Sequence, residues 1–87
     1  MVIKEVTVLN ETGIHARPAS EFVKAAGGFE SKIVVITEEK SINAKSIMGI
    51  LAGGISQGTT IKIKAEGADE NNAVDTLVNM INNRFGE

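Results

Sequence analysis

The chain of 87 residues has no cysteine, tryptophan or tyrosine, and it has only one histidine and one proline. Without cysteine it can form neither disulfides nor thiolate metal sites, and a single histidine argues against a zinc site. Three phenylalanines provide no platform on which bases could stack. Nine basic residues against eleven acidic ones give a net charge of −2, which offers no basic excess for phosphates along a nucleic acid. We expect neither a metal nor a nucleic acid as ligand.

Long apolar runs are also missing. The longest mostly apolar stretch, residues 47–55, is glycine-rich and too short to cross a bilayer. Residues 1–5 lack the charged head and long apolar stretch of a secretory signal. Together with the absence of cysteine, these features predict a cytoplasmic protein without membrane insertion. The chain is too short for two cores, so we expect a single domain spanning residues 1–87.

Cofactor motifs are absent as well. The sequence contains no Gly-x-Gly-x-x-Gly fingerprint, and the segment 44–46 lacks the upstream glycine of a P-loop. No serine stands at a strand-to-helix elbow of the kind that a serine-histidine-acid triad uses. We therefore expect no bound cofactor.

The apolar patterns predict four strands and three helices. Strands are expected at 2–9, 32–37, 40–44 and 59–66, and helices at 16–26, 47–52 and from residue 70 onwards. The β-branched run at 32–37 is typical of a central strand, whereas the polar segment 40–44 suits a sheet edge. A tight turn at Glu38 and Glu39 should join these two strands.

The predicted helices each have one apolar stripe. In the first helix it comprises Ala19, Val23 and Ala26, with Phe22 beside them. Asp69 is expected to cap the last helix. The stripe of that helix should run through Val74, Leu77, Val78, Ile81 and Phe85.

The order βαββαβα indicates the α+β class. One four-stranded antiparallel sheet, covered on one face by three helices, buries all three stripes at once in an open-faced sandwich. Right-handed crossovers place the fourth strand between the first and the second.

The segment 13–19, Gly-Ile-His-Ala-Arg-Pro-Ala, lies where a strand pattern ends and a helical one begins. A helix N-terminus disfavours the imidazolium form, so His15 should keep a free lone pair while the N–H groups of Ala16 and Arg17 hold a phosphoryl group. Arg17 adds a planar cationic fork. Pro18 disfavours helical dihedrals at Arg17, which predicts an irregular helix start. The alternative is that His15 is simply an exposed residue without chemistry.

Ser46 precedes the short helix 47–52 and is predicted to be its N-cap. Three apolar residues follow at Ile47, Met48 and Leu51. They could all belong to the core, but they span too wide an arc for one buried stripe. At least one should therefore be exposed, as in a surface that binds a partner.

The segments 13–19, 45–49 and 67–70 together resemble HPr, the histidine phosphocarrier family of the bacterial sugar phosphotransferase system, and the similarity covers the whole chain. The resemblance implies that His15 accepts a phosphoryl group on Nδ1 from phosphorylated enzyme I. It would pass this group to sugar-specific enzyme IIA domains, with Arg17 stabilising the phosphate. Such a protein is a transiently phosphorylated carrier and not an enzyme.

The resemblance also implies a regulatory role. Ser46 would be phosphorylated by an HPr kinase/phosphorylase, and the phosphorylated form would extend the partners to a catabolite-control transcription regulator. Ile47, Met48 and Leu51 would form part of the docking surface. Gly53 departs from the family pattern, in which a larger residue more often precedes a glycine, and this bears on the length of the second helix.

Two alternatives to the carrier remain. One is an HPr-like co-repressor that acts only through phosphorylated Ser46. Regulators of that kind lack the histidine, so the presence of His15 favours the carrier. The other, weaker alternative is a binding domain of similar shape without phosphate chemistry.

Overall fold

A computed structural model describes residues 1–38 and 40–86. Within them the element order confirms the predicted strands and helices. The turn predicted at Glu38 and Glu39 includes residue 39, which lies outside the described residues. The elements are β1 (Val2–Thr7), α1 (Ala16–Gly27), β2 (Lys32–Ile36), β3 (Ser41–Asn43), α2 (Ile47–Ala52), β4 (Thr60–Glu66), α3 (Glu70–Asn82) and the 3-10 turn η1 (Arg84–Gly86).

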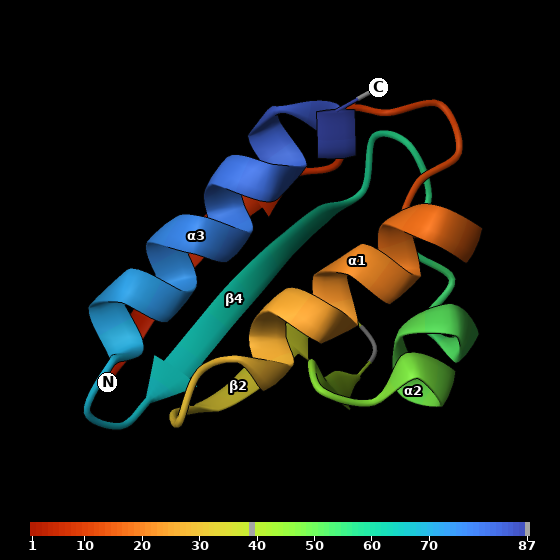
Figure 1. Cartoon of the computed structure of the whole chain (residues 1–87). Coiled ribbons are helices and arrows are strands. Elements are labelled where there is room, and N and C mark those ends of the chain that lie inside the picture. The colour runs from red at the N-terminus through yellow and green to blue at the C-terminus, as the bar shows by residue number, and fades with distance from the viewer. Residues whose placement is uncertain (39, 87) are drawn as a thin grey trace.

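The sheet has the order β1-β4-β2-β3 and is antiparallel throughout. The predicted position of the fourth strand between the first two is confirmed. β4 pairs with β1 from Val2 opposite Ala65 to Thr7 opposite Thr60. The helices lie on one side of this sheet (Figure 1). The predicted open-faced sandwich is therefore correct.

The core lies between the sheet and the helices. Ile61, Ile63 and Ala65 of β4 are buried, as the alternating pattern predicts, while Lys62 is exposed and Lys64 half-buried. The prediction was less accurate for the helices, because Val23 and Val78 are only partly buried. Val23 follows the buried Phe22, and Val78 the buried Leu77, by about 100° around the helix axis, which turns each valine toward the edge of the buried face. The fully buried helical side chains are Ala19, Phe22, Ala26, Ile50, Ala73, Val74, Leu77 and Ile81.

Phe85 is buried, but not as part of a helical stripe. α3 ends at Asn82, and Arg84 and Phe85 both have a φ of 54°. The chain therefore turns after the helix and returns the phenylalanine to the core from η1. The expected continuation of the stripe to Phe85 was wrong, because the positive φ of Arg84 and Phe85 cannot continue a right-handed helix.

Asp69 occupies the predicted N-cap position of α3, but its carboxylate does not cap the helix. It accepts hydrogen bonds from the Glu30 and Ser31 N–H groups, both at 2.9 Å, and from the Ser31 hydroxyl. These donors, the Ser31 hydroxyl foremost, hold the pKa of Asp69 below its ordinary value. The prediction of a cap was wrong because three donors of the α1–β2 loop face the same carboxylate.

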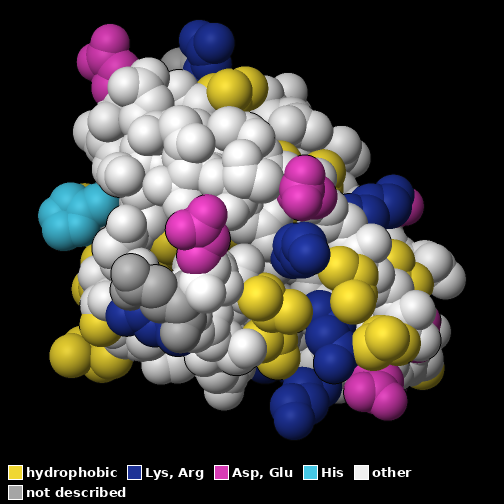
Figure 2. Space-filling model, turned by 180° about the vertical axis from the view of Figure 1, so that it is seen from behind, with side chains coloured by type: hydrophobic (Ala, Val, Ile, Leu, Met, Phe, Trp, Pro, Cys, Tyr) yellow, Lys and Arg dark blue, Asp and Glu magenta, His cyan; other side chains and the backbone are white. Residues whose placement is uncertain are grey.

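None of the helices in the described part of the chain covers the other face of the sheet. Lysine and apolar side chains interleave on this side of the molecule (Figure 2). Lys62 and Lys64 of β4 stand opposite Ile36 and Val34 of β2 on this face. The aliphatic stems of the lysines can cover the apolar neighbours while the ammonium groups stay in water, which makes an uncovered face tolerable.

Candidate functional site

The turn before α1, at Gly13, packs closely against the connection between α2 and β4, at Ile55 and Ser56. Gly13 has a φ of +64°, and a Cβ atom at this position would lie 2.4 Å from the Ile55 carbonyl oxygen. The Ile14 N–H donates to that same oxygen at 3.0 Å, and the Ile14 side chain is buried. Only glycine fits this approach, so the position of Gly13 fixes where α1 begins.

His15 is the N-cap residue of α1, with extended backbone angles (φ −141°, ψ 155°). Its imidazole is exposed and projects from the molecular surface (Figure 2), and it makes no capping hydrogen bond to α1, all of whose residues the structure describes. The irregular helix start expected at Arg17 occurs one residue earlier, because Ala16 has a φ of 50°. Pro18 is buried in the first turn, where its missing N–H removes no helical bond.

Arg17 has partners within the chain. Its Nη1 lies 2.7 Å from Oε1 of Glu21, four residues along the same helix. Both terminal nitrogens also approach the Phe85 carbonyl oxygen at 3.5 Å, so η1 reaches the first turn of α1. An incoming phosphate must therefore share the guanidinium with Glu21, or displace it.

Ser46 is the N-cap of α2, as predicted. Its Oγ accepts a hydrogen bond from the Gly49 N–H at 3.0 Å, and its carbonyl accepts one from the Ile50 N–H at the same distance. α2 ends at Ala52, and a Cβ atom at Gly53 would lie 2.7 Å from Cδ1 of Ile42. The glycine thus permits the close packing of α2 on β3.

The apolar residues of α2 do not all face the core. Ile47 is half-buried, Met48 is 74% exposed and Leu51 is 39% exposed, while Ile50 supplies the buried contact. The prediction that at least one of the first three is exposed is confirmed. α2 packs beside α1, so this apolar surface lies on the helix that neighbours the one carrying His15 (Figure 1).

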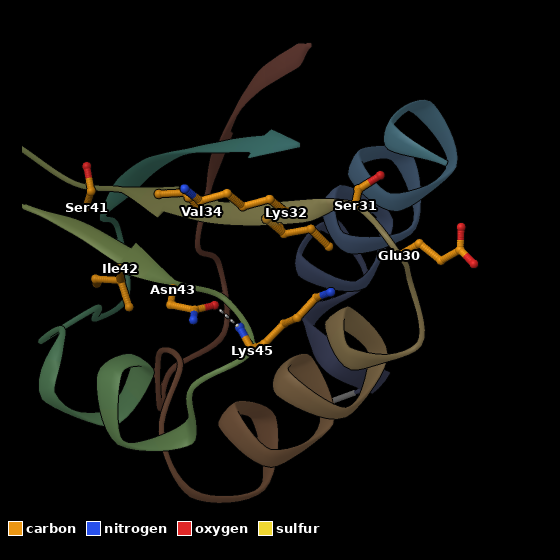
Figure 3. Close-up of a pocket in the computed structure, with 9 residues that line it drawn as sticks. Glu30, Ser31, Lys32, Val34, Ser41, Ile42, Asn43 and Lys45 are labelled. Carbon is orange, nitrogen blue, oxygen red and sulfur yellow. Dashed lines mark hydrogen bonds between the residues drawn. The ribbon is translucent and has the colours of Figure 1, made fainter. Parts of the chain in front are cut away.

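The hollows in the described part of the surface include two larger ones, and neither of these is lined by His15. One of about 430 Å³ lies between the ends of β2 and β3 (Figure 3). Lys45, which lines it, donates from Nζ to the Phe29 carbonyl at 2.8 Å. Another of about 350 Å³ lies beside the turn that leads to His15 and is polar. It is lined by Leu9, Asn10, Glu11, Thr12, Gln57 and Arg84.

Three residues of this region were missed from the sequence. Glu21 could have been found, because an acidic residue four positions after an arginine on a helix is a typical ion pair. The Phe85 carbonyl could not, since it depends on a chain reversal after α3. Asn10 follows the predicted first strand as a polar residue, and nothing in the sequence marks it as buried, yet it is 2% exposed.

Within residues 1–38 and 40–86, no helix has both the length and the apolar character to cross a membrane. The same residues contain no group of three or more His, Cys, Asp or Glu side chains that could hold a metal ion.

Comparisons with known proteins identify the family. The family model described as "PTS HPr component phosphorylation site" matches residues 2–83. The phosphocarrier protein HPr of Treponema pallidum is 42% identical over 87 residues, which cover 100% of this chain and 99% of that protein. HPr of Xylella fastidiosa is 39% identical, with coverages of 100% and 98%. The chain belongs to the HPr family of phosphocarrier proteins of the phosphotransferase system.

Solved structures agree with this assignment. A crystal structure of HPr from Thermoanaerobacter tengcongensis matches with a TM-score of 0.97 and 48% identity, covering 100% of this chain and 98% of that one. Crh of Bacillus subtilis, a catabolite repression protein described as an intertwined dimer with a swapped domain, matches with a TM-score of 0.76 and 38% identity. Each chain is covered to 97% in that comparison.

Proposed function

We propose that this chain is a phosphoryl carrier that accepts a phosphoryl group on Nδ1 of His15 from phosphorylated enzyme I and passes it to sugar-specific enzyme IIA domains. The observation that carries the proposal is the exposed His15 imidazole at the N-terminus of α1, in a member of the phosphocarrier family. The imidazole is not used as a helix cap, so both ring nitrogens are available for chemistry.

The transfer itself needs little more than positioning and charge stabilisation. The Nδ1 lone pair forms the new P–N bond as the bond between phosphorus and the donor breaks, and the ring returns to neutral when the phosphoryl group leaves. The positive end of α1 and the backbone N–H groups of Ala16 and Arg17 are suited to the phosphoryl oxygens. The Arg17 guanidinium would exchange Glu21 for these oxygens. The chain turns over no free substrate and is in this sense not an enzyme.

The test is phosphorylation with purified enzyme I and phosphoenolpyruvate, followed by measurement of the intact mass. We expect one phosphoryl group that is lost in acid and retained in alkali, because a P–N bond breaks once its nitrogen is protonated. His15→Ala should abolish the label and Ser46→Ala should retain it. A label of unchanged size in His15→Ala would contradict the proposal.

Ser46 is proposed as a regulatory site for an HPr kinase/phosphorylase, with Ile47, Met48 and Leu51 as docking residues. Met48 is 74% exposed directly beside the capping serine, which supports a contact surface there. The phosphorylated form would extend the partners to a catabolite-control transcription regulator. We further propose that residues 1–87 form one HPr-like domain that acts in the cytoplasm.

A second candidate is a co-repressor that acts through phosphorylated Ser46 alone. Its support is the structural similarity to Crh, the catabolite repression protein of Bacillus subtilis. The phosphorylation experiment separates the two, since a pure co-repressor takes no label from enzyme I. His15 favours the carrier.

A further inference from the structure

Asn10 is a buried polar residue in a turn on the surface of the molecule. Its side chain is 2% exposed, and its Nδ2 donates to the Gly13 carbonyl at 2.6 Å and to Thr12 Oγ1 at 3.2 Å. The backbone carbonyl of Asn10 accepts a hydrogen bond from the Gly13 N–H at 3.1 Å. One residue therefore closes the turn before His15 both by its backbone and by its side chain.

The same side chain has an unpaired atom. Asn10 Oδ1 is buried and has no hydrogen-bond partner among residues 1–38 and 40–86. A buried acceptor without a partner is unfavourable, and an apolar side chain of similar size would avoid that cost. Asparagine therefore carries a cost at Oδ1 beside the two hydrogen bonds that its Nδ2 donates, which directs attention to what the donor group does.

The donor group holds the backbone that carries His15. Gly13, whose carbonyl Nδ2 binds, is kept at a φ of +64° against the Ile55 carbonyl. Ile14 is then fixed by its N–H bond to Ile55 and by burial of its side chain. His15 follows immediately in extended conformation. The direction in which the imidazole leaves the surface thus depends on the shape of the turn that Asn10 closes.

We propose that Asn10 is a positioning residue for phosphoryl transfer at His15, acting through its Nδ2 hydrogen bond to the Gly13 carbonyl. The inference rests on the proposed carrier function. Group transfer between two bound residues needs the reacting atoms aligned, and small misplacements far from the chemistry cost large factors in rate. Asn10 touches neither the phosphoryl group nor the ring, so it is not itself catalytic.

The test uses the full chain with Asn10→Asp and Asn10→Ala. The aspartate is isosteric but replaces the donor by an acceptor facing the Gly13 carbonyl, and the alanine removes the donor without burying a charge. Phosphorylation by enzyme I is followed at varied concentrations of the chain. We expect the maximal rate to fall by roughly 10- to 100-fold in both variants, with little change in KM, because residues 47, 48 and 51 are untouched.

Two controls separate positioning from loss of stability. Ile33→Val shortens a fully buried side chain in β2 and should lower the melting temperature while leaving the maximal rate unchanged. Asn72→Asp makes the same chemical change on the exposed first turn of α3, so it should leave the maximal rate unchanged and the melting temperature equal or slightly higher.

The outcomes are distinguishable. A folded Asn10→Ala chain with the wild-type maximal rate overturns the inference, as does a rate loss that Ile33→Val reproduces at the same melting temperature. If the wild-type chain itself takes no phosphoryl group at His15, the proposed function fails and the inference fails with it.

Discussion

At the start of α2 the Ser46 hydroxyl accepts a hydrogen bond from its own helix, whereas at the start of α1 the His15 imidazole makes no such bond. At the Ser46 end, the Gly49 N–H has a hydrogen-bond acceptor in the serine side chain. The His15 end begins instead with Ala16 at a φ of 50°, and its side chain stays in solvent. A helix end that caps itself contributes to stability, while one that leaves its first N–H groups without a side-chain acceptor can offer them to an anion.

The comparison extends to the residues that shape the two helix ends. Gly13 is required by a positive φ and a backbone contact, whereas Gly49 lies in α2 with a negative φ and ordinary helical geometry. The His15 end of α1, proposed to bind phosphate, therefore follows a turn with a positive φ at Gly13. The Ser46 end of α2, proposed for regulation, has regular helical geometry at Gly49. The following substitutions probe this difference.

The largest effect is expected for Gly13→Ala. The new Cβ atom would meet the Ile55 carbonyl oxygen at 2.4 Å, and alanine also disfavours the φ of +64°. We expect a loss of about 2 to 4 kcal/mol in the free energy of unfolding, measured by urea denaturation, together with slower phosphorylation.

The matched variant is Gly49→Ala. There a Cβ atom would approach Ile42 Cγ2 and Ser46 Oγ at 3.2 Å, both side-chain atoms that can shift by a few tenths of an ångström. Helix propensity favours alanine by roughly 0.5 to 1 kcal/mol, so we expect a change near zero. Equal losses in the two variants would show that the two helix ends are equally constrained.

Arg17→Lys is expected to have the next largest effect, on transfer and not on the fold. Lysine keeps the charge but loses the planar fork, so the rate of phosphorylation by enzyme I should fall by an amount worth about 1 to 3 kcal/mol, or roughly 5- to 150-fold. The melting temperature should change little, because the ion pair with Glu21 is exposed.

Glu21→Gln provides the control for Arg17. It removes the acidic partner that holds Nη1 at 2.7 Å and should leave the transfer rate unchanged or faster. A slower rate in Glu21→Gln would mean that the ion pair orients the guanidinium and does not compete with the phosphate.

The sequence predicted the two helix ends unequally well. Ser46 was identified as a cap because a serine before a short apolar run is a local signal. The strand order also followed from local patterns, since right-handed crossovers leave few topologies for βαββαβα. Nothing local distinguishes Asp69 from a helix cap, because its partners lie 38 and 39 residues away.

The surroundings of His15 were harder to predict for the same reason. The irregular start was expected from Pro18 but lies at Ala16, two residues after the Ile14 N–H donates to the Ile55 carbonyl. Phe85 reaches Arg17 only because two residues after α3 adopt a positive φ. These features depend on how distant segments pack, which one sequence does not encode in a local pattern.

A third helix end gives a smaller, pH-dependent effect. Donors from Ser31 and Glu30 lower the pKa of Asp69, so its contribution to stability is fully present above the unfolded value of about 3.9 and is lost as the pH falls through the lower folded value. We expect Asp69→Asn to lower the melting temperature at pH 7. The difference from wild type should shrink as the pH falls below the unfolded value of about 3.9.

Glu70 must be controlled in this experiment. The N-terminal ammonium of Met1, 2.6 Å from Oε2, lowers the pKa of Glu70. The contribution of this carboxylate to stability is therefore also lost as the pH falls. The comparison is therefore repeated in Glu70→Gln. A difference between Asp69→Asn and its parent that stays constant with pH would contradict the assignment to the Asp69 charge.

The smallest effect is expected at Ser46, where the cap and the proposed switch can be separated. Ser46→Ala loses the bond to the Gly49 N–H and should cost about 1 kcal/mol, or roughly 4 to 8 °C in melting temperature for a chain of this size. Ser46→Asp keeps an acceptor and adds a negative charge at the helix N-terminus, so its melting temperature should equal or exceed that of wild type. The aspartate should nevertheless slow phosphorylation of His15 by enzyme I more than the alanine does, because a charge beside exposed Met48 must be desolvated when a partner docks. If both variants accept phosphate at the wild-type rate, Ser46 is a helix cap only, and the contrast between the two helix ends is one of stability without regulation.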